Sequence, residues 1–486
     1  VEALALIAFL DNYDPRRGKE HSVIAPLLES ILAGSNLLFR LSTTGFVHEA
    51  AEIRRVWESH QASDGNEVLG QCLVTGEKAP IARLHTSLQG VKDANSTGAT
   101  LVGFNAPAYE SYNRTKGQGL NSPVSQKAAF AYTTALNYLL SRENKNPKFT
   151  IGDTTVVYWA ESQNPGYAAV FSSLFGAGYA ENDTGEAAPA RDNKAELRLR
   201  EIADKIRRAQ GLDVSKLLDG LEGNPTFYVL GLAPNAARIS VRFFHTDPFQ
   251  KMIAKIMAHY ADLSIEKEYD NQPDMIPIWQ ILQETVSRKA SDKNASPLMA
   301  GSVLRAILDN SPYPAALYYQ IINRIRADMD DEKQKIKKIN YIRAAVIKAY
   351  LIRKYRNQDN PSVKEVLCMA LNEQSTNQAY LLGRLFAVLE RAQLDAIGDN
   401  IGATIKDRYF TSACATPATV FPILLRLSQH HISKGDHGRF NDAIIQKIMG
   451  LLEVDNTPFP AHLSLDQQGI FVLGYYHQRA DFFKPH

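Results

Sequence analysis

The feature that most constrains the fold is a change of pattern near Asp247. From there to the C-terminus, apolar residues recur with helical spacing, and Pro, Gly or Ser residues separate the helical segments. Before Asp247, short apolar segments alternate with turn residues, which is typical of antiparallel hairpins. The sequence therefore predicts an α+β protein with a mixed first half containing short antiparallel hairpins, followed by an all-helical half that ends in a small bundle.

The composition is that of a globular protein large enough for several domains. Its 486 residues are 45% apolar and 22% charged with a formal net charge of +2, so nucleic-acid binding would require local clusters of charge. The three separated cysteines predict neither a disulfide framework nor a zinc site, and we expect a reducing, cytoplasmic setting. No apolar run is long enough to span a membrane. The chain opens at Val1 in a helix-like segment, so we expect further residues upstream.

Composition divides the chain into four predicted segments. Residues 1–182 form an α+β region with a polar loop, and the stretch up to Lys194 has the composition of a linker. Residues 195–246 contain a charged helix and a basic hairpin. Residues 247–368 form a helical region with a basic helix, and residues 369–486 form the C-terminal bundle.

A long polar loop within Cys72–Leu140 is the first binding candidate. It follows two predicted strands, QCLVT and IARLH, and precedes a helix that we expect Ser122 to cap with Pro123 in the first turn. Loops of this length are usually functional or disordered. Residues of types that contact phosphates and base edges are Lys92, Asn95, Ser96, Asn105, Asn113, Arg114, Lys116, Gln118 and Asn121. The alternative is that Asn and Ser satisfy the backbone of turns.

The predicted hairpin FYVLGLAPNAARISVRFFH is the second candidate. Alternation along its second strand places Ile239, Val241 and Phe243 on an apolar face, and Arg238 and Arg242 on a basic face. That basic face, which also carries an aromatic ring, can hold phosphates and stack a base. Two arginines on an exposed strand are equally ordinary, so both interpretations stay open.

The segment KQKIKKINYIRAAVIKAYLIRKYR predicts one helix with nine basic residues and no acidic residue. Because like charges on a helix repel each other, this pattern favours a nearby phosphate backbone. The candidate residues are Lys337, Lys338, Arg343, Lys348 and Lys354. The alternative is a solvated charged face beside an apolar stripe.

Motifs for catalysis are incomplete. HEAAE lacks the second histidine of a zinc-protease helix, and GQGLNS lacks the third glycine of a dinucleotide fingerprint. The histidines of HHISKGDHGRF and the acids of DMDDE fit helix ends better than a metal site. We therefore predict no enzyme activity, no metal and no cofactor. The rival functions are a metal-dependent nuclease, which would need converging carboxylates or histidines, and an RNA-binding structural scaffold.

Several segments resemble the large subunit of the type I-C CRISPR surveillance complex, or Cascade. They are CLVTGEKAPIARLH, STGATLVGFNAPAYESY, GQGLNSPVSQKAAFAYTTALNYLL and YLLGRLFAVLERAQ. The resemblance spans most of the chain, and members of that family begin with a further N-terminal region. It implies a non-catalytic subunit of a crRNA-guided ribonucleoprotein complex in antiviral defence, assembled with a backbone subunit and a subunit that holds the guide's 5′ end.

By this resemblance, the chain would help to recognise the short motif (PAM) that flanks the target in double-stranded DNA. It would also help to open the duplex into an R-loop, bind the displaced single strand and recruit a helicase-nuclease. The family further implies a small subunit made by internal translation of the C-terminal bundle, and Met369 is the start that we expect. No base-reading residue is transferred by position, so the site residues rest on the loop and charge arguments.

Overall fold

The computed structural model describes most of residues 4–483. It leaves out scattered residues up to 67, and then 113, 115–116, 142–143, 145–147, 177–222, 288–289, 291–294, 331–336, 399–402 and 453–456. The predicted linker near residues 182–194 and the charged helix after it lie outside the described residues. No helix among the described residues is long and apolar enough to cross a membrane.

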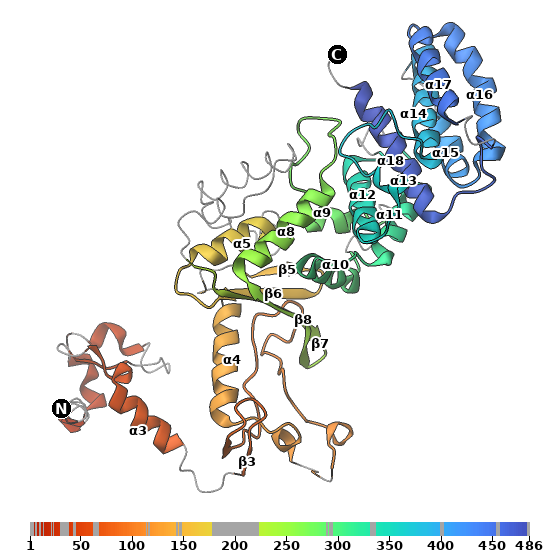
Figure 1. Cartoon of the computed structure of the whole chain (residues 1–486). Helices are drawn as coiled ribbons and strands as arrows, with labels where there is room; N and C mark the ends of the chain where they lie inside the picture. Colours follow the sequence, from red (N-terminus) through yellow and green to blue (C-terminus); the bar gives the residue numbers. More distant parts are fainter. Residues whose placement is uncertain are drawn as a thin grey trace. The chain divides into compact units, whose positions relative to one another are not determined.

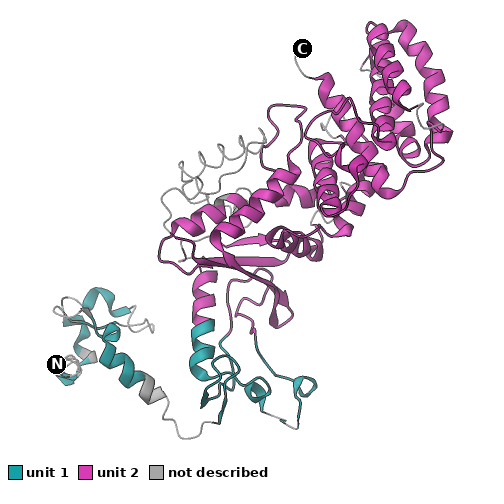
Figure 2. Ribbon diagram, viewed as in Figure 1, with its two compact units in different colours: residues 1–86, 102–132 teal, residues 87–101, 133–486 magenta. Residues whose placement is uncertain are grey.

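The chain divides into two compact units (Figure 2). Unit 1 contains residues 1–86 and 102–132, and unit 2 contains residues 87–101 and 133–486. The polar loop predicted from the sequence is therefore shared, since its first part belongs to unit 2 and its second part to unit 1. The four segments expected from composition remain predictions.

Unit 1 is built from short elements. They are the 3-10 helices η1 (Pro15–Glu20), η2 (Ala25–Leu27), η3 (Val47–Glu49), η4 (Pro107–Tyr109) and η5 (Gln118–Asn121), the helix α3 (Ala51–Gln61), and the hairpins β1 (Arg40–Leu41) with β2 (Gly45–Phe46) and β3 (Leu69–Gln71) with β4 (Lys78–Pro80). The second hairpin is real, but its strands start earlier than QCLVT and IARLH predicted. Gly119 packs so closely on the backbone of Ala82 that a Cβ would lie 1.9 Å from the Ala82 carbonyl oxygen.

The helix after the loop, α4 (Gln126–Leu140), starts later than predicted. The side-chain oxygen of Ser125 accepts a hydrogen bond from the backbone N–H of Ala128 at 3.2 Å, as expected of an N-cap residue. Ser122 is therefore not the cap, and Pro123 precedes the helix. The boundary between the two units falls inside α4.

Unit 2 begins with a four-stranded antiparallel sheet (Figure 1). Its strands follow the order β5 (Phe149–Ile151), β6 (Thr154–Ala160), β7 (Thr226–Asn235) and β8 (Arg238–Pro248). The helices α5 (Gly166–Gly176) and α8 (Phe249–Leu263) pack on one face, where Phe227, Val229 and Phe243 join the core. The hairpin predicted at residues 226–246 is confirmed, with Asn235 paired to Arg238.

The rest of unit 2 is helical, as the sequence predicted. The helices are α9 (Ile278–Gln283), α10 (Pro297–Asp309), α11 (Ala315–Ala327), α12 (Tyr341–Tyr355), α13 (Pro361–Lys364), α14 (Gln378–Ile397), α15 (Ile405–Ala415), α16 (Pro417–Lys434), α17 (Gly438–Leu452) and α18 (Leu465–Phe482). Polar caps explain several starts, and both Thr404 and Ser464 form reciprocal capping boxes. Hairpins before Asp247 and helices after it confirm the α+β fold.

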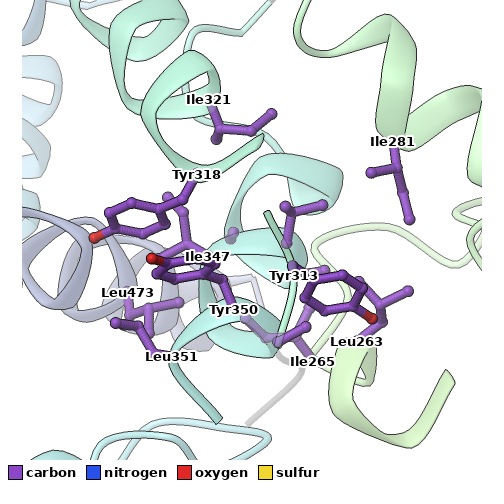
Figure 3. Close-up of a cluster of buried hydrophobic side chains, with 14 of the residues drawn as sticks. Leu263, Ile265, Ile281, Tyr313, Tyr318, Ile321, Ile347, Tyr350, Leu351 and Leu473 are labelled. Carbon is purple, nitrogen blue, oxygen red and sulfur yellow. The ribbon is translucent and has the colours of Figure 1, made fainter. Parts of the chain in front are cut away.

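One apolar core runs through unit 2 from the sheet to the last helix. Figure 3 shows its centre, where Ile347 and Leu351 of α12 lie close to Tyr318 of α11 and Leu473 of α18, and where Leu263 of α8 lies beside Tyr313. The core therefore continues across residue 369, where the sequence predicted a separate bundle. Burial of this continuous apolar surface is the main force that holds the helical half together.

Candidate nucleic-acid interface

The first part of the polar loop, residues 87–101, is fixed to unit 2 at its base. Leu88 and Ala99 form an antiparallel bridge and are both buried. The side-chain amide of Asn137 on α4 accepts from the N–H of Gln89 at 2.9 Å and donates to the carbonyl of Ser87 at 3.1 Å. These bonds hold the loop against a helix, which gives it a rigid support.

Two further contacts fasten the same loop to the sheet. The N–H of Lys92 donates to the hydroxyl of Thr155 on β6 at 2.9 Å. Thr100 bridges Arg238 at the start of β8, and the N–H of Ile239 donates to its carbonyl at 3.0 Å. Lys92 is thus placed by its backbone, while its side chain is half-exposed.

The tip of this loop is an exposed polar turn. Asn95, Ser96 and Thr97 are exposed, and the turn closes with a bond from the N–H of Gly98 to the carbonyl of Asn95 at 2.8 Å. Gly98 has φ +95°, and a Cβ there would meet Ser87 and the carbonyl of Leu88. Only glycine fits this position well, so the chain presents Asn95 and Ser96 on a defined turn.

The second part of the loop, in unit 1, uses several of its polar groups internally. Asn121 accepts from the N–H of Ser111 at 3.0 Å and donates to the carbonyl of Gln118 at 3.1 Å. Gln118 accepts from Arg83 at 2.5 Å, and Arg114 donates to the carbonyl of Leu120. Asn121 therefore has the turn-satisfying role that the sequence left open for Asn and Ser, and Arg114 also bonds the backbone of the loop, whereas Gln118 bonds a side chain. Nucleic-acid binding by Asn121, Arg114 and Gln118 stays a prediction.

The remaining loop candidates of unit 1 are less informative. Asn105 is exposed and has an interaction of its own within the structure. Asn113 and Lys116 lie outside the described residues. A nucleic-acid role for these three residues stays a prediction.

The hairpin candidates of β8 lie in unit 2, beside the base of the loop. Arg238 pairs with Asn235 across the turn and also bridges Thr100. Arg242 forms an ion pair with Asp153 at 2.8 Å, and 40% of its side chain stays exposed. Exposed ion pairs contribute little free energy, so a phosphate can replace Asp153 at small cost.

The alternation predicted along β8 is interrupted by a bulge. Val241 pairs with Leu232 and Phe243 with Gly231, which leaves Arg242 as the extra residue without a partner in register. Consequently Val241, predicted to be on the apolar face, is 48% exposed, whereas Ile239 and Phe243 are buried as predicted. The apolar and basic faces are therefore less cleanly divided than the sequence suggested.

The basic helix is largely buried, and the argument from its unopposed charge is wrong. The helix begins at Tyr341, so Lys337 and Lys338 precede it. Arg343 is 1% exposed and pairs with Glu284 at 2.6 Å and with Asp328 at 2.7 Å. The missing acids come from other elements, and no phosphate is needed to neutralise this side chain.

Two lysines of the same set are also buried, and among the described residues they bond backbone carbonyls and no carboxylate. Lys348 donates to the carbonyls of Asp262 and Ser264 at 3.1 and 2.7 Å, at the C-terminal end of α8. Lys338 donates to the carbonyl of Lys406 at 3.2 Å. Burial disfavours the charged ammonium, so it lowers the pKa of Lys348 to about 8 and also lowers the pKa of Lys338.

The last two basic candidates are partly exposed but paired. Lys337 bonds Glu268 at 2.9 Å and lies over the ring of Tyr269. Lys354 bonds Asp466 of α18 at 2.6 Å. Lys354 thus links α12 to α18, and Lys337 links the segment before α12 to the segment after α8. Nucleic-acid binding by these side chains would require that they exchange partners.

Sequence reasoning missed two rings on the sheet. Trp159 of β6 and Tyr228 of β7 are cross-strand neighbours, and their rings stack at 5.1 Å between centroids. Alternation within one strand indicates which face of the sheet a ring occupies. That the two rings are neighbours depends on the pairing of β6 with β7, two strands that are far apart in the sequence. Among the described residues, no group of three or more His, Cys, Asp or Glu side chains is placed to hold a metal ion.

Comparison with known proteins identifies the chain at family level. No curated protein matches its sequence. The family model of the CRISPR-associated protein Cas_Csd1 matches residues 1–483, which is nearly the whole chain. The match agrees with the resemblance seen in the sequence motifs. The chain therefore belongs to the Cas_Csd1 family, that of the large subunit of the type I-C CRISPR complex.

Proposed function

We propose that this protein is a non-catalytic subunit that helps a crRNA-guided complex recognise the motif flanking its DNA target. Guide pairing supplies the long sequence specificity of such complexes, and protein side chains read the short duplex motif. The further roles that we propose are opening of the duplex, binding of the displaced strand, and recruitment of a helicase-nuclease. Its partners would then be target DNA, the crRNA-bound backbone and guide-end subunits, a small subunit and that nuclease.

The observation that carries the proposal is the anchored polar turn of residues 94–98. Asn95 and Ser96 are exposed at its tip, and their amide and hydroxyl groups can bond base edges. The base of the loop is held by Asn137, Thr155 and the bridge to Arg238. A rigid support with an exposed polar tip is what base reading requires, because a mobile loop would lose entropy on binding.

The test is the ratio of affinities for two target duplexes, one with the flanking motif and one with a scrambled flank, in the assembled complex. We expect the double variant Asn95→Ala/Ser96→Ala to lower this ratio about tenfold, since good contacts to a base are worth about 1–3 kcal/mol. Gln429→Ala on the exposed face of α16 is the matched control and leaves the ratio unchanged. An unaltered ratio in the double variant would remove motif reading from this loop.

A second variant tests the support of the loop independently of its tip. Asn137→Ala removes the bonds to Ser87 and Gln89 but leaves Asn95 and Ser96 in place. If the fixed position of the turn matters, this variant lowers the same ratio while the melting temperature of the chain changes little. The absence of catalysis is tested separately, by incubating the isolated chain with DNA and Mg²⁺, where we expect no cleavage.

A further inference from the structure

A cluster of three aromatic rings lies on the sheet face that α5 and α8 do not cover. Trp159 stacks on Tyr228 with 5.1 Å between ring centroids and 12° between planes. Tyr228 stacks on Phe244 with 6.1 Å and 20°. Trp159 and Phe244 are also only 6.4 Å apart, with 31° between planes, so the three rings form one compact cluster from β6, β7 and β8.

The strand pairing places these rings opposite the core. Trp159 pairs with Tyr228, and Tyr228 pairs with Thr246, two residues beyond Phe244 on β8. Because side chains alternate along a strand, Tyr158 and Phe243 point to the other face, where they belong to the core with α5 and α8. The cluster therefore lies on the face of the sheet on which the backbone N–H of Lys92 bonds Thr155.

One ring of the cluster is exposed. In the sheet order β8 is the last strand, and Phe244 is 57% exposed. Trp159 and Tyr228 contact it and are half-buried. Apolar rings gain free energy by burial, so an exposed ring that two other rings hold in place is suited to a further flat ring.

Positive charge lies on β8 near Phe244. Arg242 is two residues before Phe244, on the bulge, and its side chain pairs with the partly exposed Asp153. A guanidinium nitrogen of Arg305 on α10 donates to the carbonyl of Arg242 at 2.6 Å, which places a second exposed cation beside β8. A ligand that combines a flat ring with a nearby anion would complement both features, and a nucleotide has both.

We propose that Phe244, backed by Tyr228 and Trp159, is a stacking site for an unpaired base of the displaced DNA strand, with Arg242 and Arg305 facing its phosphates. This inference rests on the proposed function, because an R-loop leaves one DNA strand unpaired while the guide RNA is paired with the other. Stacking on an aromatic ring tolerates any base, which suits a strand whose sequence differs between targets.

The test measures the affinity of the full chain for single-stranded DNA that carries 2-aminopurine, whose fluorescence falls on stacking. We expect Phe244→Ala to weaken binding about five- to a hundredfold, since stacking one base is worth about 1–3 kcal/mol and about 1.4 kcal/mol changes affinity tenfold. Phe244→Trp keeps both the affinity and the fluorescence change. Phe440→Ala, at a 48% exposed ring on α17, is the matched control and has no effect.

Three outcomes would overturn the site. They are wild-type affinity in Phe244→Ala, equal loss in Phe244→Ala and Phe244→Trp, and tighter binding of RNA than of DNA of the same sequence. Release of another protein subunit by Phe244→Ala, with DNA affinity intact, would also overturn it in favour of a protein partner. The test of Asn95→Ala/Ser96→Ala compares two duplexes with different flanks, whereas the test of Phe244→Ala uses single-stranded DNA. Failure of the stacking site is therefore distinguishable from failure of the proposed motif recognition.

Discussion

At the scale of single residues, buried cations act as structural links in this protein. Arg353 of α12 is 3% exposed and pairs with Asp262 at 2.8 Å, and it donates to the carbonyls of Ala306 and Ser311. Arg343 has a comparable set of acidic and carbonyl partners. A guanidinium can satisfy several acceptors at once, so one side chain joins elements that are distant in the sequence.

This arrangement predicts that Arg343→Met destabilises the fold without weakening phosphate binding. Loss of the guanidinium removes this ion-pair partner from Glu284 and from Asp328, which are both mostly buried, and leaves Asp328 with Arg324 alone; the loss costs about 3–5 kcal/mol. Urea denaturation measures the loss, and the slope of DNA affinity against salt, taken where the variant is still folded, stays at the wild-type value.

Arg439→Met, at an exposed position of α17, serves as the control and is expected to change stability by less than about 0.5 kcal/mol. A variant of Arg343 with wild-type stability and a reduced salt slope would show that the phosphate interpretation was correct after all.

At the scale of elements, the β7–β8 hairpin carries strain at its turn. Asn235 pairs with Arg238, so Ala236 and Ala237 form a two-residue turn, and Ala236 has φ 51°. Left-handed backbone is unfavourable for alanine because of its Cβ. Tight hairpin turns usually place glycine or asparagine at such a position.

Ala236→Gly should therefore stabilise the hairpin by about 1 kcal/mol, because glycine adopts this φ freely. The matched control is Ala237→Gly, because Ala237 does not have a positive φ. There glycine only raises the entropy of the unfolded chain, so the substitution lowers the stability. Hydrogen exchange of the β7 and β8 amides measures both changes. Equal effects of the two substitutions would show that the turn is not strained.

The elements also show how far the sequence could predict the structure. Local patterns were sufficient to predict the hairpin of residues 226–248 and the helical second half, because alternation and helical spacing are properties of a single segment of sequence. The bulge at Arg242 was not predictable, since it depends on pairing with Gly231 and Leu232. The burial of α12 was missed because its acids lie elsewhere in the chain, as Asp262 does for Arg353 at a separation of 91 residues.

The candidate site was predicted in part for the same reason. The polar composition of the loop marked Asn95 and Ser96, which are exposed. The same composition marked Asn121, whose amide instead bonds Ser111 and Gln118 within the loop. Residue type alone does not separate a side chain that faces solvent from one that closes a turn.

At the scale of the whole molecule, the continuous core of unit 2 bears on the proposed small subunit. Leu473 of α18 packs with residues of α12 (Figure 3), and Lys406 of α15 pairs with Asp330. Arg479 lies 3.7 Å from Glu268. A product that began at Met369 would contain only one partner of each of these contacts. Its side of each contact would be exposed, so we expect to find the product bound to a partner surface.

Met369→Leu tests whether that product is made. Leucine has nearly the volume of methionine, and the backbone carbonyl that accepts from Glu266 is retained, so the full chain keeps its fold. We expect the C-terminal product to disappear from complexes purified with the natural gene, as measured by intact-mass spectrometry. Met449→Leu on α17 is the control and leaves the product in place; an unchanged product in Met369→Leu would place its start elsewhere.

The pairing of Lys354 with Asp466 has a consequence for protein synthesis. The two residues are 112 positions apart, so at about 5–20 residues per second the lysine leaves the ribosome roughly 6–22 s before its acid. During this interval Lys354 lacks Asp466 as its partner, on a nascent chain that lies beside ribosomal RNA. A truncated chain that ends before residue 466 would keep that cation unneutralised. Its affinity for nucleic acid would then report an incomplete chain and not the function of the finished protein.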